Sequence, residues 1–213
     1  MTMQRIVIAT HNMGKLREYR DLLGDLPVAL VSLADLGLTE SPEETGSSFE
    51  ENARLKALAY ARAAGLLTLA DDSGLEVDAL GGAPGIHSAR YGGGEAPNDE
   101  ARYRLLLNNL AHVPGPERTA RFRCVVALAA PQGEIYMAEG RCEGRIGYGP
   151  VGEHGFGYDP VFIVAGRDVT MAQLPPEEKN RISHRARALQ AIRPALTRLL
   201  ESYHPPTDSN GLE

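Results

Sequence analysis

Residues 4–24, QRIVIATHNMGKLREYRDLLG, place a short apolar run directly before an amphipathic one. The first six letters predict a buried strand, and the leucines and the tyrosine that follow recur at helical spacing until Gly24. A polar loop, Thr10–Lys15, separates the two predicted elements. Because a strand followed by a packed helix is the unit from which α/β proteins are built, we predict an α/β fold.

The rest of the chain continues this mixture of strands and helices. Strands are predicted for residues 28–33, 66–70, 120–130, 134–145 and 161–165. Helices are predicted for residues 48–64, 99–110 and 177–203. The strand at 66–70 is expected to stop at Asp71-Asp72-Ser73-Gly74. Two carboxylates and a hydroxyl would then lie at a strand end, where α/β proteins usually bind ligands.

The composition is that of an ordinary globular protein. Of 213 residues, 43% are hydrophobic and 23% are charged, which allows a buried core. A net charge of -6 argues against a surface built for nucleic acid, and no apolar stretch reaches the ~18 residues of a membrane span. We expect no nucleic-acid or membrane partner and, without a secretory signal, a cytoplasmic location. Cys124 and Cys142 lack metal-ligand spacing and are predicted to be free thiols.

The loop Thr10–Lys15 is a candidate phosphate site. It lies at the predicted N-terminus of a helix, where unpaired N–H groups and the helix dipole attract anions. It is not a Walker A loop, because Leu16 follows the lysine where that motif has serine or threonine. The alternative is a simple connection between a strand and a helix.

Two acidic pairs are candidates for a metal site. Glu43 and Glu44 lie in the polar linker SPEETG, and taken alone they are better explained as solvated acids. Asp71 and Asp72 are harder to dismiss, because adjacent carboxylates repel unless a cation neutralises them. Mg²⁺ takes only one or two protein carboxylates and fills its remaining positions with water and substrate phosphates.

Aromatic and basic residues in the second half suggest a binding site for a base. The run Phe156-Gly157-Tyr158-Asp159 offers an aromatic face beside a carboxylate, although it could equally form a hairpin corner. Lys179, His184 and Arg185 cluster near the start of the last helix, where the dipole disfavours cations. The alternative for these three residues is a solvated basic face.

Six motifs in series resemble the inosine triphosphate pyrophosphatase family, over roughly residues 5–200. They are THNMGK (10–15), SFEENARLKA (48–57), ADDSGLEVDALGGAPGI (70–86), SARY (88–91), GFGYDPVF (155–162) and EEKNRISHR (177–185). The resemblance implies hydrolysis of ITP, dITP or XTP to the monophosphate and pyrophosphate. It also implies an elongated two-lobed α/β fold with a long mixed sheet, flanking helices and a central cleft, assembled as a homodimer.

The resemblance also implies roles for residues. Glu43 and Asp72 would bind Mg²⁺, and Asp72 would act as the catalytic proton acceptor. The substrate-binding residues would be Thr10, His11, Asn12, Met13, Gly14, Lys15, Ser73, Phe156, Gly157, Tyr158, Asp159, Lys179, His184 and Arg185. His11 and His87 depart from the family pattern, in which a small residue and an aromatic one are expected.

The 6-oxo group of hypoxanthine and xanthine is an acceptor where adenine has an amino donor, so Lys179 and Arg185 would favour the deaminated bases. Guanine has the same oxo group, which these donors do not distinguish. Two other functions stay open: a related pyrophosphatase for modified pyrimidine or standard nucleotides, and a nucleotide-binding sensor without catalysis. We expect one domain, residues 1–203, and a disordered tail, residues 204–213.

Overall fold

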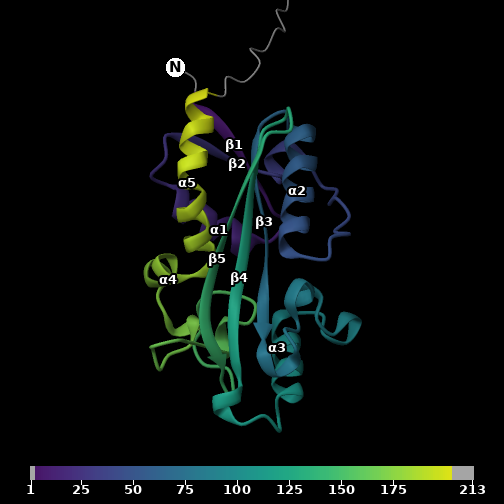
Figure 1. The fold of residues 1–213 in the computed structure, drawn as a ribbon, viewed down its shortest axis with the longest axis vertical. Coiled ribbons are helices and arrows are strands. Elements are labelled where there is room, and N and C mark those ends of the chain that lie inside the picture. Colours follow the sequence, from purple (N-terminus) through teal and green to yellow (C-terminus); the bar gives the residue numbers. More distant parts are fainter. Residues whose placement is uncertain (1–2, 203–213) are drawn as a thin grey trace, which may run out of the picture.

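The computed structural model describes residues 3–202, which form one mixed β-sheet with helices on both sides. The molecule is elongated, and the β4–β5 hairpin runs along much of its length (Figure 1). The expected α/β fold with a long mixed sheet flanked by helices is confirmed. The expected disordered tail, residues 204–213, lies outside the described residues.

The sheet has the strand order β2-β1-β3-β4-β5-β6. Its strands are β1 Gln4–Ala9, β2 Val28–Ser32, β3 Leu67–Val77, β4 Thr119–Ala129, β5 Ile135–Ile146 and β6 Phe162–Val164. Strand β1 is parallel to both β2 and β3, and every pair from β3 onward is antiparallel. The predicted hairpin of residues 120–145 is therefore confirmed.

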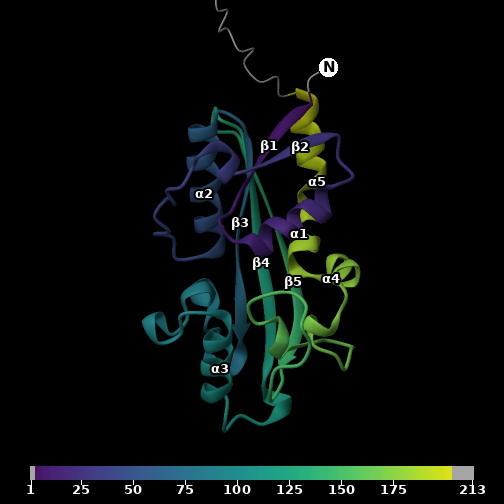
Figure 2. The ribbon, with the colours of Figure 1, turned by 180° about the vertical axis from the view of Figure 1, so that it is seen from behind.

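The helices are α1 Met13–Leu23, α2 Phe49–Ala64, α3 Asp99–Asn109, α4 Pro176–Ile182 and α5 His184–Ser202. Short 3₁₀ helices are η1 Ala34–Leu36, η2 Asp78–Leu80, η3 Gly85–Arg90, η4 Gly93–Glu95, η5 Gly115–Glu117, η6 Asp159–Val161 and η7 Met171–Gln173. Helices α2 and α3 lie on one side of the long strands and α5 and α4 on the other (Figures 1 and 2). Ser48 caps α2 by accepting from the Glu51 N–H, and Gly65 ends it in the left-handed region.

The prediction that a strand ends at Asp71 is wrong, because β3 continues to Val77. Strand β1 pairs with β3 only as far as Ala70, whereas β4 pairs with β3 along its whole second half. The low strand propensity of Asp-Asp-Ser-Gly is thus overridden by pairing with β4. The acids lie mid-strand, at the point where β3 loses its neighbour on one side.

The two neighbouring aspartates point to opposite faces of the sheet, since side chains alternate along a strand. Asp71 contacts Lys15 of α1 and Arg185 of α5, whereas Asp72 contacts Lys56 of α2. The expected repulsion between adjacent carboxylates is therefore relieved by the alternation itself. Each aspartate has its own cationic partner.

Candidate active site

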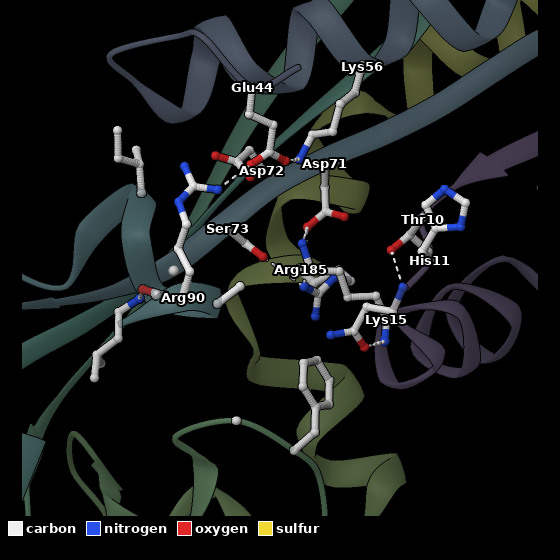
Figure 3. A pocket seen from close by; sticks show the side chains of 18 of the residues that line it. Thr10, His11, Lys15, Glu44, Lys56, Asp71, Asp72, Ser73, Arg90 and Arg185 are labelled. Carbon is white, nitrogen blue, oxygen red and sulfur yellow. Dashed lines mark hydrogen bonds and ion pairs between the residues drawn. The ribbon is translucent and has the colours of Figure 1, made fainter. Parts of the chain in front are cut away.

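A cavity of about 600 Å³ opens beside β3, just beyond the end of β1. Thr10, His11, Asn12, Lys15, Glu43, Asp72, Ser73, Phe156, Gly157, Tyr158, Asp159, Lys179, His184 and Arg185 line it. Figure 3 shows the phosphate-loop residues, the two aspartates and the basic side chains converging on one space. Of the predicted site residues, only Met13 and Gly14 are not part of the lining, and neither is His87.

The phosphate loop partly satisfies its own N–H groups. The Asn12 side chain accepts hydrogen bonds from the N–H groups of Gly14, at 2.8 Å, and of Lys15, at 3.1 Å. The loop is therefore a capped helix start rather than a fully open anion nest. Met13 begins the helix with 63% of its surface exposed, outside the cavity.

Gly14 is required by packing against an aromatic ring. A Cβ atom at this position would lie 2.6 Å from Cδ1 of Phe156 and 2.8 Å from its Cγ. The close approach of the helix backbone to Phe156 thus joins the phosphate loop to the predicted base-binding segment.

Asp71 is the centre of a buried ionic cluster. Its Oδ2 lies 2.9 Å from Lys15 Nζ and 3.3 Å from Arg185 Nη2, and the side chains of Asp71 and Arg185 are each 1% exposed. Burial alone would raise the pKa of Asp71, but Lys15 and Arg185 outweigh it and hold that pKa well below its usual range. Arg185 also donates to Ser73 Oγ, at 3.0 Å.

Asp72 lies in a different electrostatic environment on the other face. Its Oδ1 accepts from Lys56 Nζ at 2.9 Å, and its Oδ2 accepts from Asn52 Nδ2 at 3.3 Å. Burial raises the pKa of Asp72 above its usual value, although Lys56 acts in the opposite direction. A carboxylate with a raised pKa is suited to accept a proton near neutral pH.

The two glutamates of the linker differ in their contacts. Glu44 accepts from Lys56 at 2.9 Å and from Arg90 at 3.0 Å, so Lys56 bridges Glu44 and Asp72. Glu43 is exposed and lines the same cavity, and no side chain among the described residues bonds to its carboxylate. Glu43 is therefore the member of the pair that is free to bind a cation.

The predicted base-binding residues form a second buried ionic cluster. Lys179 Nζ pairs with Asp159 and lies 2.7 Å from Glu18, which also pairs with Arg185. The Phe156 ring lies above these cations, 4.9 Å from Lys179 Nζ. The cluster holds the cations in place beneath an aromatic face.

Tyr158 and His184 have roles that the sequence does not indicate. Tyr158 is buried and donates its hydroxyl to the Ser88 carbonyl, at 2.9 Å, so it anchors the loop to η3. His184 stacks on Phe122 with ring centroids 4.8 Å apart. Burial, together with the nearby cations Arg185 and Lys179, lowers the pKa of His184 well below its usual value and keeps the ring neutral.

Among the site residues that our reading of the sequence missed, four contact charged side chains of the site. They are Glu18, Asn52, Lys56 and Arg90. Glu18 is three residues from Lys15 and therefore on the same helix face, a signal that was available. Asn52 and Lys56 are likewise four residues apart on α2, within the motif SFEENARLKA. Arg90 lies in the motif SARY and gave no independent signal.

No cluster of three or more His, Cys, Asp or Glu side chains with metal-binding geometry occurs among residues 3–202. That finding is compatible with Mg²⁺, which needs only one or two protein carboxylates. Cys124 and Cys142 are buried free thiols, as predicted. None of the described helices is both long enough and apolar enough to cross a membrane.

Comparison with known proteins identifies the family. A profile of the Ham1 family matches residues 6–195. The dITP/XTP pyrophosphatase of Bacillus subtilis is 49% identical over 200 residues, covering 94% of this chain and 98% of that protein. The dITP/XTP pyrophosphatase of Geobacter sulfurreducens is 51% identical over 191 residues, covering 90% and 96%.

Solved structures agree. The Staphylococcus aureus Ham1 protein is 44% identical with a TM-score of 0.80, covering 92% of this chain and 99% of that one. A dITP/XTP pyrophosphatase from Mycobacterium abscessus is 46% identical with a TM-score of 0.72, covering 90% and 100%. The resemblance read from the six motifs is thereby confirmed, and the chain belongs to the Ham1 family.

Proposed function

We propose that this chain hydrolyses the deaminated purine nucleotides ITP, dITP and XTP to the monophosphate and pyrophosphate. The observation that carries the proposal is the composition of one cavity. It joins the phosphate loop, the buried carboxylate Asp72 with its raised pKa, and the Phe156 ring above fixed cations. Relatives named dITP/XTP pyrophosphatase support the substrate class.

The base would bind at Phe156, Lys179 and Arg185. Two carboxylates occupy Lys179, which has three N–H donors, and Nη1 of Arg185 pairs only with Glu18 among residues 3–202, which leaves one of its two N–H groups. Each cation therefore keeps a donor that the 6-oxo group of hypoxanthine or xanthine would satisfy. The amino group of adenine would leave these donors unpaired, which disfavours ATP.

The donors present fit Mg²⁺. Within residues 3–202 no side chain pairs with the Glu43 carboxylate, and each oxygen of Asp72 keeps a lone pair beyond the bond it accepts. When bound, Mg²⁺ would supply positive charge that offsets the negative charge developing on the phosphates. We assign Glu43 and Asp72 as its protein ligands.

The protein residues would divide the remaining work. Asp72 would accept the proton of the water that attacks the linkage between the α and β phosphates. Lys15, at the phosphate loop, would help to neutralise the departing pyrophosphate, and Lys56 would hold Asp72 in place. Thr10, His11, Asn12, Met13 and Gly14 would complete the phosphate loop, and Ser73 would contact substrate beside Asp72.

The test is Asp72→Asn, assayed with ITP and Mg²⁺. Loss of a positioned base should reduce kcat at least ~10²-fold. Asp78→Asn is the matched control, because Asp78 is an exposed acid of η2 that pairs with Arg121 outside the cavity. Activity of Asp72→Asn within tenfold of the parent would refute the assignment.

A substrate panel tests the nucleotide class. Hydrolysis of ITP and XTP well above that of ATP and of modified pyrimidine nucleotides is expected. Saturable ITP binding with no phosphate product would instead identify a sensor.

We extend the proposal to a single domain, residues 1–203, that forms a cytoplasmic homodimer. Light scattering after gel filtration checks the dimer.

A further inference from the structure

The hydroxyl of Tyr60 joins three parts of the cavity. It donates to the main-chain oxygen of Glu40, at 3.0 Å, and lies 3.1 Å from Nε2 of His11. Tyr60 comes from α2, His11 from the phosphate loop, and Glu40 from the start of the acidic linker, residues 40–46. One buried side chain therefore contacts both segments that are proposed to hold phosphates and metal.

Tyr60 belongs to a row of polar residues on α2. Asn52, Lys56 and Tyr60 are four residues apart and so share one helix face. Asn52 accepts from the Gly46 N–H at 2.9 Å, and Lys56 binds Glu44 at 2.9 Å. The row thus holds the acidic linker at its start, middle and end.

Counting protons fixes the state of His11. A phenolic hydroxyl has one proton, and the Glu40 carbonyl oxygen can only accept, so the Tyr60 O–H donates its hydrogen bond to Glu40. Toward His11 the hydroxyl is then an acceptor, and His11 must carry a proton on Nε2. The ring atom left for a ligand is Nδ1, which in the neutral ring carries a lone pair and no proton.

We propose that Tyr60 is a positioning residue that holds His11 in the Nε2–H form, so that His11 hydrogen-bonds a phosphate oxygen only through a protonated Nδ1. This inference rests on the proposed function of the loop as a phosphate site. It goes beyond that function by assigning to Tyr60 control over when His11 contributes. The charged groups that line the cavity together with His11 include Lys15 from α1, Lys56 from α2, Glu43 and Glu44 from the linker, and Asp71 and Asp72 from β3.

The experiment is calorimetric binding of inorganic tripolyphosphate, without metal, at about pH 5.5 and at about pH 8.5. The readout is the ratio of the Kd of His11→Ala to the Kd of its parent, measured at each pH. Both proteins bind the same ligand at the same pH, so protonation of tripolyphosphate cancels from this ratio. In the parent background we expect His11→Ala to weaken binding about fivefold at the lower pH and less than about twofold at the higher pH.

Tyr60→Phe should change this pattern at high pH. Without the hydroxyl acceptor, the neutral ring can place its proton on Nδ1 and donate, so His11→Ala should then weaken binding about threefold at about pH 8.5. Tyr136→Phe is the matched control, because its hydroxyl bonds the exposed Glu134 outside the cavity and its loss should leave the parental pattern. Thermal unfolding checks that Tyr60→Phe, which keeps the buried ring, remains folded.

A His11 effect that is equal at both pH values in the parent, or that Tyr60→Phe leaves unchanged, would overturn the inference. So would a parent that does not bind tripolyphosphate. The assay involves neither a nucleobase nor catalysis. If the binding pattern is as expected but ITP is not hydrolysed, the proposed function alone is refuted.

Discussion

Replacing each of the two neighbouring aspartates by asparagine should have opposite consequences. Asp71 is ion-paired to Lys15 and Arg185 inside the protein, and the fold strongly favours its charged form. Removing one partner from a buried ion pair typically costs about 3–5 kcal/mol. For a chain of this size, that corresponds to a fall in Tm of roughly 6–20 °C.

Asp72→Asn should leave stability within about 1 kcal/mol of the parent. The fold raises the pKa of Asp72, so folding favours the neutral form, and a neutral amide of the same shape loses nothing on burial. Lys56 keeps Glu44 as a partner after the change. Asp72→Asn should therefore abolish activity in a stable protein, and Asp71→Asn should destabilise the protein.

Urea unfolding followed by circular dichroism, with ITP hydrolysis measured on the same samples, separates the two effects. The folded pKa of Asp71 is depressed, so its stabilisation is fully present above the unfolded pKa of about 3.9 and is lost as pH falls. The stability gap between the parent and Asp71→Asn should accordingly be full at pH 7 and shrink below about pH 4. Equal costs for the two variants at pH 7 would refute the assignment of the aspartates to opposite faces.

Three further outcomes are expected. Gly14→Ala should raise KM for ITP and lower the free energy of unfolding by about 1–3 kcal/mol, because the new Cβ would lie 2.6 Å from the Phe156 ring. Adding Phe156→Leu to the same chain should recover part of this stability. Absence of any recovery would contradict the proposed packing. Arg118→Met should lower the free energy of unfolding by at least about 2 kcal/mol, because the buried guanidinium donates to three main-chain carbonyl groups. An unchanged midpoint in urea unfolding would argue against that role. Burial would raise the pKa of Glu139, but hydrogen bonds from Arg123 and Arg141 outweigh it and lower that pKa to about 2. Glu139→Gln should therefore lower the free energy of unfolding above about pH 4.3, and this loss should fade as pH falls toward about 2. Urea unfolding measured across this pH range checks the prediction.

The sequence alone determined most of the elements and several of their ends, but not the end of β3. Helical spacing gave α1 and α2, Ser48 and Gly65 marked the ends of α2, and the turn at 131–133 defined the long hairpin. These signals are local, because caps, turns and periodic patterns act over a few residues. Motif order along the chain was likewise sufficient to indicate the family, and most of the site residues predicted from it line the cavity.

Only the tertiary structure decided how the acidic residues work. Asp71-Asp72 looked like a metal-binding pair at a strand tip, but pairing with β4 carries β3 onward and turns the two carboxylates to opposite faces. Local sequence does not reveal where a neighbouring strand ends, since register depends on the packing of both faces. The bridging of Glu44 and Asp72 by Lys56 was equally hidden, because these residues meet only when α2 packs on the sheet.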